Sequence, residues 1–195
     1  MNSRRCSDDH DDVTGPLLLF PDTTVLINFH ICSAMPLLDT LTRKRGQWTA
    51  TIRQECIRKE GDLKLPQLAA AAEGVFGDPL YPDEDEHRAI RDLRALMARP
   101  GDHRDQHLGE AETVVILERR ALNAVFITDD SHVQEFTHKT CITSWDLLGH
   151  GLRLGEVTED QIRSMRATLL AQRRVHINEV KDAASFEMWL ASRKR

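Results

Sequence analysis

The 195-residue sequence lacks several features that would place it in a specialised class of protein. No apolar run approaches the roughly 20 residues that a membrane-spanning helix needs, and the opening MNSRRCSDDHDD lacks the apolar segment of a secretory signal peptide. The four cysteines, at positions 6, 32, 56 and 141, include no pair at metal-ligand spacing. We therefore expect a cytoplasmic protein without membrane association, whose thiols are buried or incidental in a reducing compartment.

The sequence also lacks an excess of positive charge. Its 26 lysines and arginines are outnumbered by 31 acidic residues, so the formal net charge is −5. This balance argues against binding nucleic acid through one large basic face. It does not argue against an enzyme that acts on nucleic acid, because acidic residues gathered around a metal ion would contribute several of those charges.

Short apolar runs alternate with amphipathic helical patterns over residues 15–150. We expect strands at about Leu17–Phe20, in AVFITDD (124–130) and in TCITSWD (140–146), with a further short strand at Gln47–Ala50. A helical pattern starts near Thr24 and extends toward Leu41, and other helical patterns separate the later strands. Strands separated by helices favour an α/β fold with a mostly parallel sheet.

The two ends of the chain differ from this middle part. Residues 1–14 are polar and acidic, and we expect a disordered tail there. Residues 151–195 are predicted to form a C-terminal helical extension to the domain of residues 15–150. The sequence TEDQ at Thr158–Gln161 is typical of a capping box, and Phe186, Trp189 and Leu190 follow at helical spacing.

Acidic residues recur at the ends of the expected strands and beside apolar helical stripes. They are Asp22, Glu55, the pair Glu110 and Glu112, and the pair Asp129 and Asp130. Several carboxylates at the carboxyl edge of one sheet repel one another, and their pKa values rise unless a cation neutralises them. Hard oxygen ligands suit Mg²⁺ or Mn²⁺ rather than zinc. Metal-assisted hydrolysis of a phosphodiester is the chemistry that such a site supports.

Structural interpretations of the same residues remain open. Asp22 is well placed to cap a helix, Glu55 also suits the role of an exposed helical acid, and Asp129 and Asp130 suit a turn or a cap. Glu110 has the place of a first-turn acid that a helix dipole favours. His103 and His107 stand four residues apart, as zinc ligands on a helix do, but their polar loop and the lack of a nearby cysteine argue against zinc.

Four segments together resemble a known family. DTTVLI (22–27), IRQE (52–55), LGEAE (108–112) and ITDD (127–130) are similar to the successive acidic motifs of the PIN domain. The resemblance covers about residues 17–148. It implies a three-layer fold, with a central mostly parallel sheet flanked by helices, and a Mg²⁺- or Mn²⁺-dependent ribonuclease activity. Because such ribonucleases are common as toxins of toxin–antitoxin pairs, the resemblance also implies RNA, a cognate antitoxin protein and a second copy of the chain as partners.

The resemblance also implies roles for individual residues. Asp22 matches the first metal carboxylate of the family and Glu55 the second. Glu112 fits the third by its spacing to Asp130, with Glu110 one step outside, although the family usually has Asp there. Asp130 fits a Thr-x-Asp pattern that begins at Thr128. The implied catalytic and metal-binding residues are therefore Asp22, Glu55, Glu112 and Asp130, with Asp129 and Glu110 as further candidate ligands.

Two other functions compete with the ribonuclease. A phosphatase of the haloacid dehalogenase type also has an Asp after its first strand, but it needs a second Asp where this chain has Thr24. A non-catalytic PIN-like module that binds RNA or protein would be expected to have lost some of its acids. All four positions are acidic here, which favours the enzyme.

Overall fold

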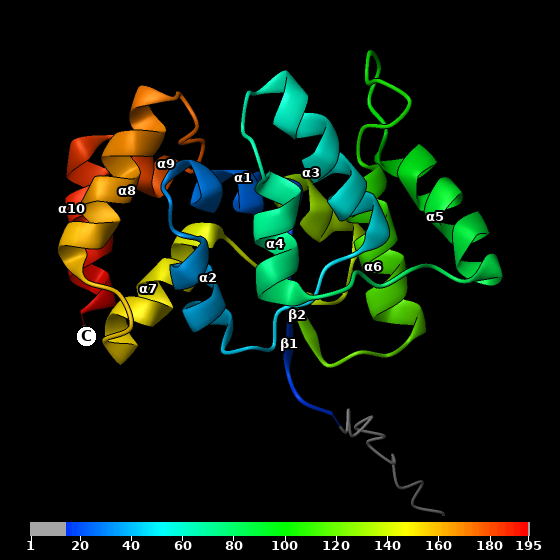
Figure 1. Ribbon diagram of the computed structural model, residues 1–195, viewed down its shortest axis with the longest axis horizontal. Helices are drawn as coiled ribbons and strands as arrows, with labels where there is room; N and C mark the ends of the chain where they lie inside the picture. The colour runs from blue at the N-terminus through cyan, green and yellow to red at the C-terminus, as the bar shows by residue number, and fades with distance from the viewer. Residues whose placement is uncertain (1–14, 195) are drawn as a thin grey trace, which may run out of the picture.

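The computed structural model describes residues 15–194 (Figure 1). The tail predicted for residues 1–14 lies outside this range. The elements, in chain order, are β1 (Leu18–Pro21), α1 (Thr23–Ile31), α2 (Met35–Thr42), α3 (Ala50–Asp62), α4 (Leu68–Phe76), α5 (Glu84–Met97), α6 (Leu108–Arg119), β2 (Ala124–Ile127), the 3₁₀ helix η1 (Ser131–Phe136), β3 (Thr140–Ile142), α7 (Ser144–Leu154), α8 (Glu159–Ala171), α9 (Asn178–Lys181) and α10 (Ala183–Arg193).

A parallel sheet lies at the centre of the fold. Within the described residues it has the strand order β1-β2-β3, and both neighbouring pairs are parallel. Leu18 of β1 faces Ala124 of β2, and Pro21 faces Ile127, so these two strands end together. The parallel α/β architecture expected from the alternating pattern is confirmed. Because the strands are parallel, residues that follow β1 and β2 emerge at the same edge of the sheet.

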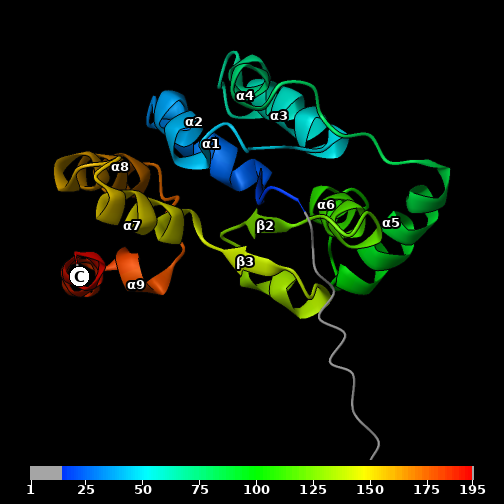
Figure 2. The same ribbon diagram turned by 90° about the horizontal axis from the view of Figure 1, so that it is seen from below.

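Helices cover both faces of the sheet (Figure 2). One face contributes Leu19 and Ile127 to a core that includes α1 to α4 and the helices from α7 onward. The other face contributes Phe20 and Phe126 to a core with α5, α6 and η1. The side-chain alternation of a strand explains this division, since successive residues point to opposite faces. The expected central sheet between two helical layers is therefore present.

The short strand expected at Gln47–Ala50 is not formed as a strand. The chain there makes only isolated bridges, from Gly46 to Leu19 and from Thr49 to Leu80. The main-chain amide of Gln47 donates to the carbonyl of Leu19 at 2.9 Å, so the segment does lie beside β1. It turns away into α3 before a ladder of hydrogen bonds develops.

The helical pattern from Thr24 toward Leu41 is divided into two helices. α1 ends at Ile31, and α2 begins at Met35 with Pro36 in its first turn. Ser33 between them has a φ of 53°, in the left-handed region, which an α-helix cannot continue through. The apolar spacing persisted across the break because both helices pack on the same core.

The boundary expected at residue 150 falls within α7, which runs from Ser144 to Leu154. The C-terminal helices join the core of the first sheet face through Trp145, Phe186 and Trp189. The rings of Trp145 and Trp189 meet edge to face with centroids 5.8 Å apart. Among residues 15–194, no helix combines the length and apolar character needed to cross a membrane.

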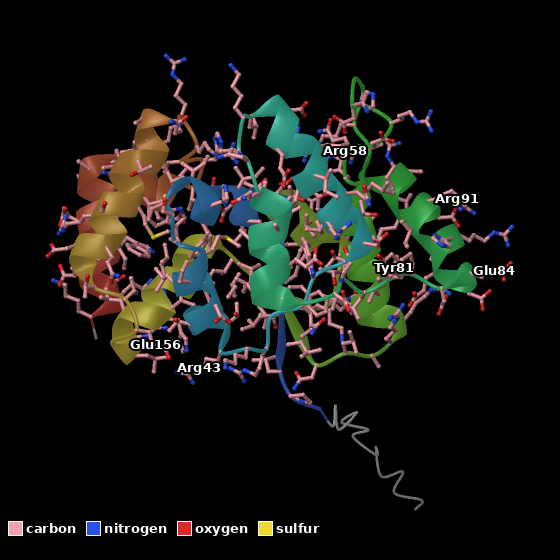
Figure 3. The ribbon with its side chains drawn as sticks, viewed as in Figure 1. Arg43, Arg58, Tyr81, Glu84, Arg91 and Glu156 are labelled. Carbon is pink, nitrogen blue, oxygen red and sulfur yellow. The ribbon has the colours of Figure 1, made fainter. Side chains whose placement is uncertain are left out.

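A salt bridge also ties the later helices to the first half of the chain. Arg43, at the end of α2, lies 2.8 Å from Glu156 on the turn after α7, and both are labelled in Figure 3. The helices of residues 151–194 thus pack on the same core as the sheet, as expected for helices that extend the domain.

Candidate metal centre

Asp22 lies at the junction of β1 and α1, at the carboxyl edge of the sheet. Its main-chain amide donates to the carbonyl of Ile127 at 2.8 Å, which fixes it beside the end of β2. Its carboxylate accepts from the amide of Thr23 at 2.6 Å and is only 4% exposed. Burial raises the pKa of Asp22 well above its ordinary value, the carboxylates of Glu110 and Glu55 raise it further, and local amides lower it. Asp22 is therefore both a helix cap and a member of an acidic cluster.

Glu55 reaches this cluster from α3. The hydroxyl of Thr23 donates to Glu55 Oε2 at 2.5 Å, and burial raises the pKa of Glu55 while this hydrogen bond lowers it. α3 passes close to the start of α6 at Gly109, where a Cβ atom would lie 2.9 Å from Glu55 Oε1 and 2.6 Å from Ile52. A Cβ atom there would displace the ends of these two side chains, so glycine at this position leaves room for the Glu55 carboxylate beside the first turn of α6.

Glu110 extends the cluster from the first turn of α6. Burial raises its pKa to about 7, with further contributions from Glu55 and Asp130. A carboxylate oxygen of Glu110 and one of Asp130 lie within 4.8 Å of each other. Glu110 and Glu55 thus raise the pKa of Asp22, and Glu55 and Asp130 raise that of Glu110, as expected for carboxylates gathered at one edge of a sheet.

Asp130 follows β2 and begins η1. One of its carboxylate oxygens accepts from the amide of His132 at 2.9 Å, and its own amide donates to the hydroxyl of Thr128 at 3.1 Å. The Thr-x-Asp pattern therefore has a structural basis, because the buried hydroxyl of Thr128 holds the turn that presents Asp130. Asp130 caps η1 and lies beside Glu110 at the same time.

The structure does not place Glu112 with Asp22 and Asp130, contrary to the expected convergence. Its carboxylate accepts from the amide of Thr51 at 2.7 Å and from the hydroxyl of Thr51 at 2.6 Å. Thr51 belongs to the first turn of α3, so Glu112 acts as a cap for that helix. The physical reason is helical geometry, since residues two apart on an α-helix point about 200° apart. Glu110 faces the acidic cluster and Glu112 faces the N-terminus of α3.

Asp129 has a different set of partners. Its Oδ1 accepts from the amide of Ser144 at 2.8 Å, the hydroxyl of Ser144 lies 2.9 Å from both oxygens, and Asn28 donates to Oδ2 at 3.3 Å. Burial raises the pKa of Asp129, and these hydrogen bonds lower it. Asn28 in turn accepts from Arg174 Nε at 2.7 Å. Asp129 therefore joins the first turn of α7 to α1 and to the segment after α8.

His107 is a member of this region that sequence reasoning set aside. It precedes α6, is 8% exposed, and has Nδ1 3.8 Å from Glu110 Oε1. His107, Glu110 and Asp130 each offer one ligand atom within 4.8 Å of the others. Its loop looked polar and exposed in the sequence, and the signal that was available is its place directly before the LGEAE motif.

A cleft opens beside the acidic cluster, between α3 and the loop that precedes α6. It has a volume of about 460 Å³ and is lined by Glu55, Arg58, Lys59, Asp62, His103, Asp105, Gln106, His107 and Glu110. Arg58, labelled in Figure 3, lies on α3 near that loop, with Nη1 3.5 Å from Asp105 Oδ2. The cleft thus places two cationic side chains of α3, Arg58 and Lys59, within one turn of the carboxylate of Glu55.

Comparisons of the chain with protein-family models, with curated proteins and with solved structures found no match.

Proposed function

We propose that this protein is a metal-dependent endoribonuclease that hydrolyses RNA phosphodiester bonds and holds Mg²⁺ or Mn²⁺ with Asp22, Glu55, Glu110 and Asp130. The observation that carries the proposal is the gathering of these four carboxylates, from four separate segments, at the carboxyl edge of a parallel sheet. The resemblance to PIN domains supports the same reaction. Glu110 takes the third ligand position in place of Glu112, whose oxygens are engaged by Thr51.

The donor set fits a hard divalent cation. Carboxylates whose pKa values are raised, as those of Asp22, Glu55 and Glu110 are, cost free energy when they ionise, and a cation among them offsets that cost. All four donors are oxygen atoms, which suits Mg²⁺ and Mn²⁺. When bound, such an ion acidifies a water molecule and stabilises negative charge on phosphate oxygens.

The protein's own groups position the ligands and the substrate. Thr23 holds Glu55 through its hydroxyl, and Thr128 holds the turn that carries Asp130. Arg58 and Lys59 in the adjoining cleft supply positive charge for the phosphates that flank the scissile bond. A single strand of RNA is the substrate that we propose, since its bases and backbone bend freely into a cleft beside the cluster.

The partners follow from the same proposal. RNA is the substrate, a cognate antitoxin protein blocks the cleft, and the chain pairs with a second copy, all in the cytoplasm. A short reading frame with a DNA-binding motif directly beside this gene is the expected source of the antitoxin. Co-expression of its product with this chain should yield a complex that no longer cuts RNA. If the two proteins do not bind, the toxin role is refuted and the proposed nuclease activity is unaffected.

The test is cleavage of end-labelled RNA, single-stranded and duplex, with DNA of the same sequence as a control. We expect cleavage of the single strand with Mg²⁺ or Mn²⁺ and none in EDTA. Ca²⁺ should not support turnover, because it takes more ligands at longer distances and spreads the reacting groups. Equal cleavage in EDTA would refute the metal-dependent mechanism. RNA that binds in Mg²⁺ and stays intact would support the non-catalytic module instead.

A further inference from the structure

A buried histidine beside the acidic cluster has a ring nitrogen without a hydrogen-bond partner. Nδ1 of His107 is shielded from solvent and makes no hydrogen bond with any of residues 15–194, whereas Nε2 lies 3.3 Å from Asp102 Oδ2. A buried polar group without a partner loses the solvation that it had in water, so such groups are rare unless a ligand satisfies them. The ring of His107 is 8% exposed, which leaves little room for bulk water to satisfy it.

The position of the ring places Nδ1 near the carboxylate of Glu110, which is itself close to that of Asp130. Nδ1 of His107 lies 3.8 Å from Glu110 Oε1, and the two residues form a three-membered group with Asp130 whose ligand atoms lie within 4.8 Å of one another. Metal–ligand distances of about 2.1 Å allow one cation to touch two atoms up to about 4.2 Å apart. One ion between His107 and Glu110 therefore contacts both without a change in backbone position.

The second ring nitrogen is placed as in known metal-binding histidines. Nε2 of His107 lies 3.3 Å from Asp102 Oδ2, and Asp102 is itself held by the amide of Arg99 at 2.7 Å. A metal-ligating histidine almost always directs its other ring nitrogen at a carboxylate or carbonyl, which fixes the ring and raises its basicity. Asp102 is thus in position to accept the Nε2 proton when Nδ1 binds a metal.

We propose that His107, Glu110 and Asp130 form a subsite for a divalent first-row transition metal of the Mn²⁺ class, with His107 Nδ1 as its nitrogen ligand. The proposal rests on the proposed metal centre, because the subsite shares Glu110 and Asp130 with it, but it does not depend on RNA as the substrate. An imidazole nitrogen favours transition metals, whereas Mg²⁺ prefers oxygen. We therefore expect the nitrogen ligand to favour Mn²⁺ over Mg²⁺ at this subsite.

His132 is the nearest rival as a nitrogen donor. Its ring centroid lies 6.0 Å from that of His107. However, its Nε2 lies 3.3 Å from the carbonyl oxygen of Met97, and its ring packs edge to face on Phe136 with centroids 4.9 Å apart. Nδ1 of His132 also makes no hydrogen bond within residues 15–194, but it lies 3.6 Å from Glu135 Oε2, and His132 is absent from the group of converging ligand atoms.

The experiment is electron spin-echo envelope modulation of the full chain loaded with Mn²⁺, with parallel titrations of Mn²⁺ and Mg²⁺ binding. The test variant is His107→Asn. Asn is chosen because residue 107 has a φ of 65° and asparagine tolerates the left-handed region. The matched control is His103→Asn, which alters an exposed histidine that lines the same cleft.

We expect wild type and His103→Asn to show nitrogen modulation, and His107→Asn to lose it. The Mn²⁺ affinity of His107→Asn should fall about 10-fold or more, the range seen when groups that support a metal ligand are removed, while its Mg²⁺ affinity moves less than about threefold. Modulation that survives in His107→Asn, or that disappears equally in His103→Asn, would overturn the subsite. Equal binding of Mn²⁺ and Mg²⁺ by wild type would overturn it as well.

Two further measurements separate the possible failures. Wild-type protein labelled with ¹⁵N-histidine tests nitrogen ligation without any variant, so the proposal stays testable if His107→Asn does not fold. RNA cleavage is measured on the same samples. If wild type cleaves RNA but shows no nitrogen modulation, the subsite is refuted and the ribonuclease stands. If it shows modulation but does not cleave RNA, the ribonuclease is refuted and the subsite stands. A wild-type chain that binds no Mn²⁺ would refute both proposals.

Discussion

Two regions of this molecule bury carboxylates, and they treat them in opposite ways. At the start of α5, Glu86 is 2% exposed and accepts from Arg120 Nε at 2.8 Å and Nη2 at 2.6 Å. It also completes a capping box with Asp83. Its hydrogen bonds with Arg120 lower the pKa of Glu86. At the carboxyl edge of the sheet, burial and like charges raise the pKa values of Asp22 and Glu110 instead.

The difference shows which buried acids serve the fold. Glu86 and Glu112 have partners that match their charge or their hydrogen-bonding capacity, so their burial is compensated within the protein. At the carboxyl edge, Arg58 and Lys59 lower the pKa of Glu55, but Asp22 and Glu110 have neighbouring carboxylates that raise their pKa values. Uncompensated buried acids are typical of functional sites. The comparison therefore assigns a structural role to Glu86 and Glu112, and it identifies the edge cluster as the candidate site at which we propose that a metal ion binds.

The largest effect on RNA cleavage is expected for Asp22→Asn, which tests whether the edge cluster differs from the acids that serve the fold. Cleavage of RNA should fall by a factor of about 10² or more, comparable to the loss of one preorganised electrostatic group in an active site. The metal-free variant should melt at the wild-type temperature or slightly higher, because Asn caps a helix about as well as Asp and one repelling charge is gone. Cleavage rates with Mg²⁺ and thermal melting in EDTA measure both effects. Wild-type cleavage by this variant would return Asp22 to a capping role alone.

Glu86→Gln is the corresponding variant at the start of α5, where the buried acid is bound by Arg120. It removes the charge that Arg120 binds, so the free energy of unfolding should fall by roughly 1–3 kcal/mol, the range for hydrogen bonds to charged groups. Cleavage measured well below the melting temperature should be unchanged, since Glu86 lies outside the cluster. A loss of cleavage in the folded variant would show that the two regions are not independent.

An intermediate effect is expected when pH is varied without metal. The pKa of Glu110 rises from an ordinary value of 4.5 to about 7 in the folded chain, so the folded state binds the extra proton between these values. Stability from Glu110 is therefore present below pH 4.5 and is lost as pH rises to about 7, by an amount of about 3 kcal/mol at most.

The variant Glu110→Gln isolates this contribution. Its advantage over metal-free wild type in unfolding free energy should grow from pH 5 to pH 7.5, as measured by urea denaturation. Saturating Mn²⁺ should reverse the trend for wild type, because the metal binds the deprotonated carboxylates and is bound more tightly as pH rises. A difference that stays constant with pH would mean that Glu110 is not buried among like charges.

The smallest effect is expected for Glu112→Gln, which is compared with Glu110→Gln on the same helix, α6. Glu112→Gln weakens the cap that Thr51 donates to, so the free energy of unfolding should fall by about 1 kcal/mol. Cleavage by folded Glu112→Gln should stay within about threefold of wild type, whereas Glu110→Gln should lose cleavage as Asp22→Asn does. If Glu112→Gln abolished cleavage while it remained folded, the third ligand would be Glu112, as its spacing to Asp130 first indicated.

Much of the fold followed from local patterns. The apolar runs predicted β1, β2 and β3 within a few residues, and the capping box at Thr158–Gln161 is formed, with Thr158 accepting from the amide of Gln161. The parallel sheet followed because helices separate the strands. The break at Ser33 was missed, since a left-handed residue between two helices leaves the apolar spacing intact.

The site was only partly predictable. Asp22 and Asp130 were predicted at the carboxyl edge because acids that follow strands can be read from the sequence, whereas Glu55 was selected by the PIN-like motif and reaches Asp22 from α3. The choice of Glu112 over Glu110 relied on spacing to Asp130, and spacing along the chain says nothing about where helix α6 begins. His107 was set aside because a polar loop in the sequence gives no sign that it folds over a buried cluster.

The sequence alone determined that this chain is an α/β protein with a parallel sheet and with acids at its strand ends, because apolar periodicity and caps act over a few residues. Only the tertiary structure decided which acids meet. α6 begins at Leu108 and passes Glu55 at Gly109, which rotates Glu110 into the cluster and Glu112 toward Thr51. A rotation of about 100° per residue makes that outcome depend on the packing of α3 against α6, a contact between segments far apart in the chain.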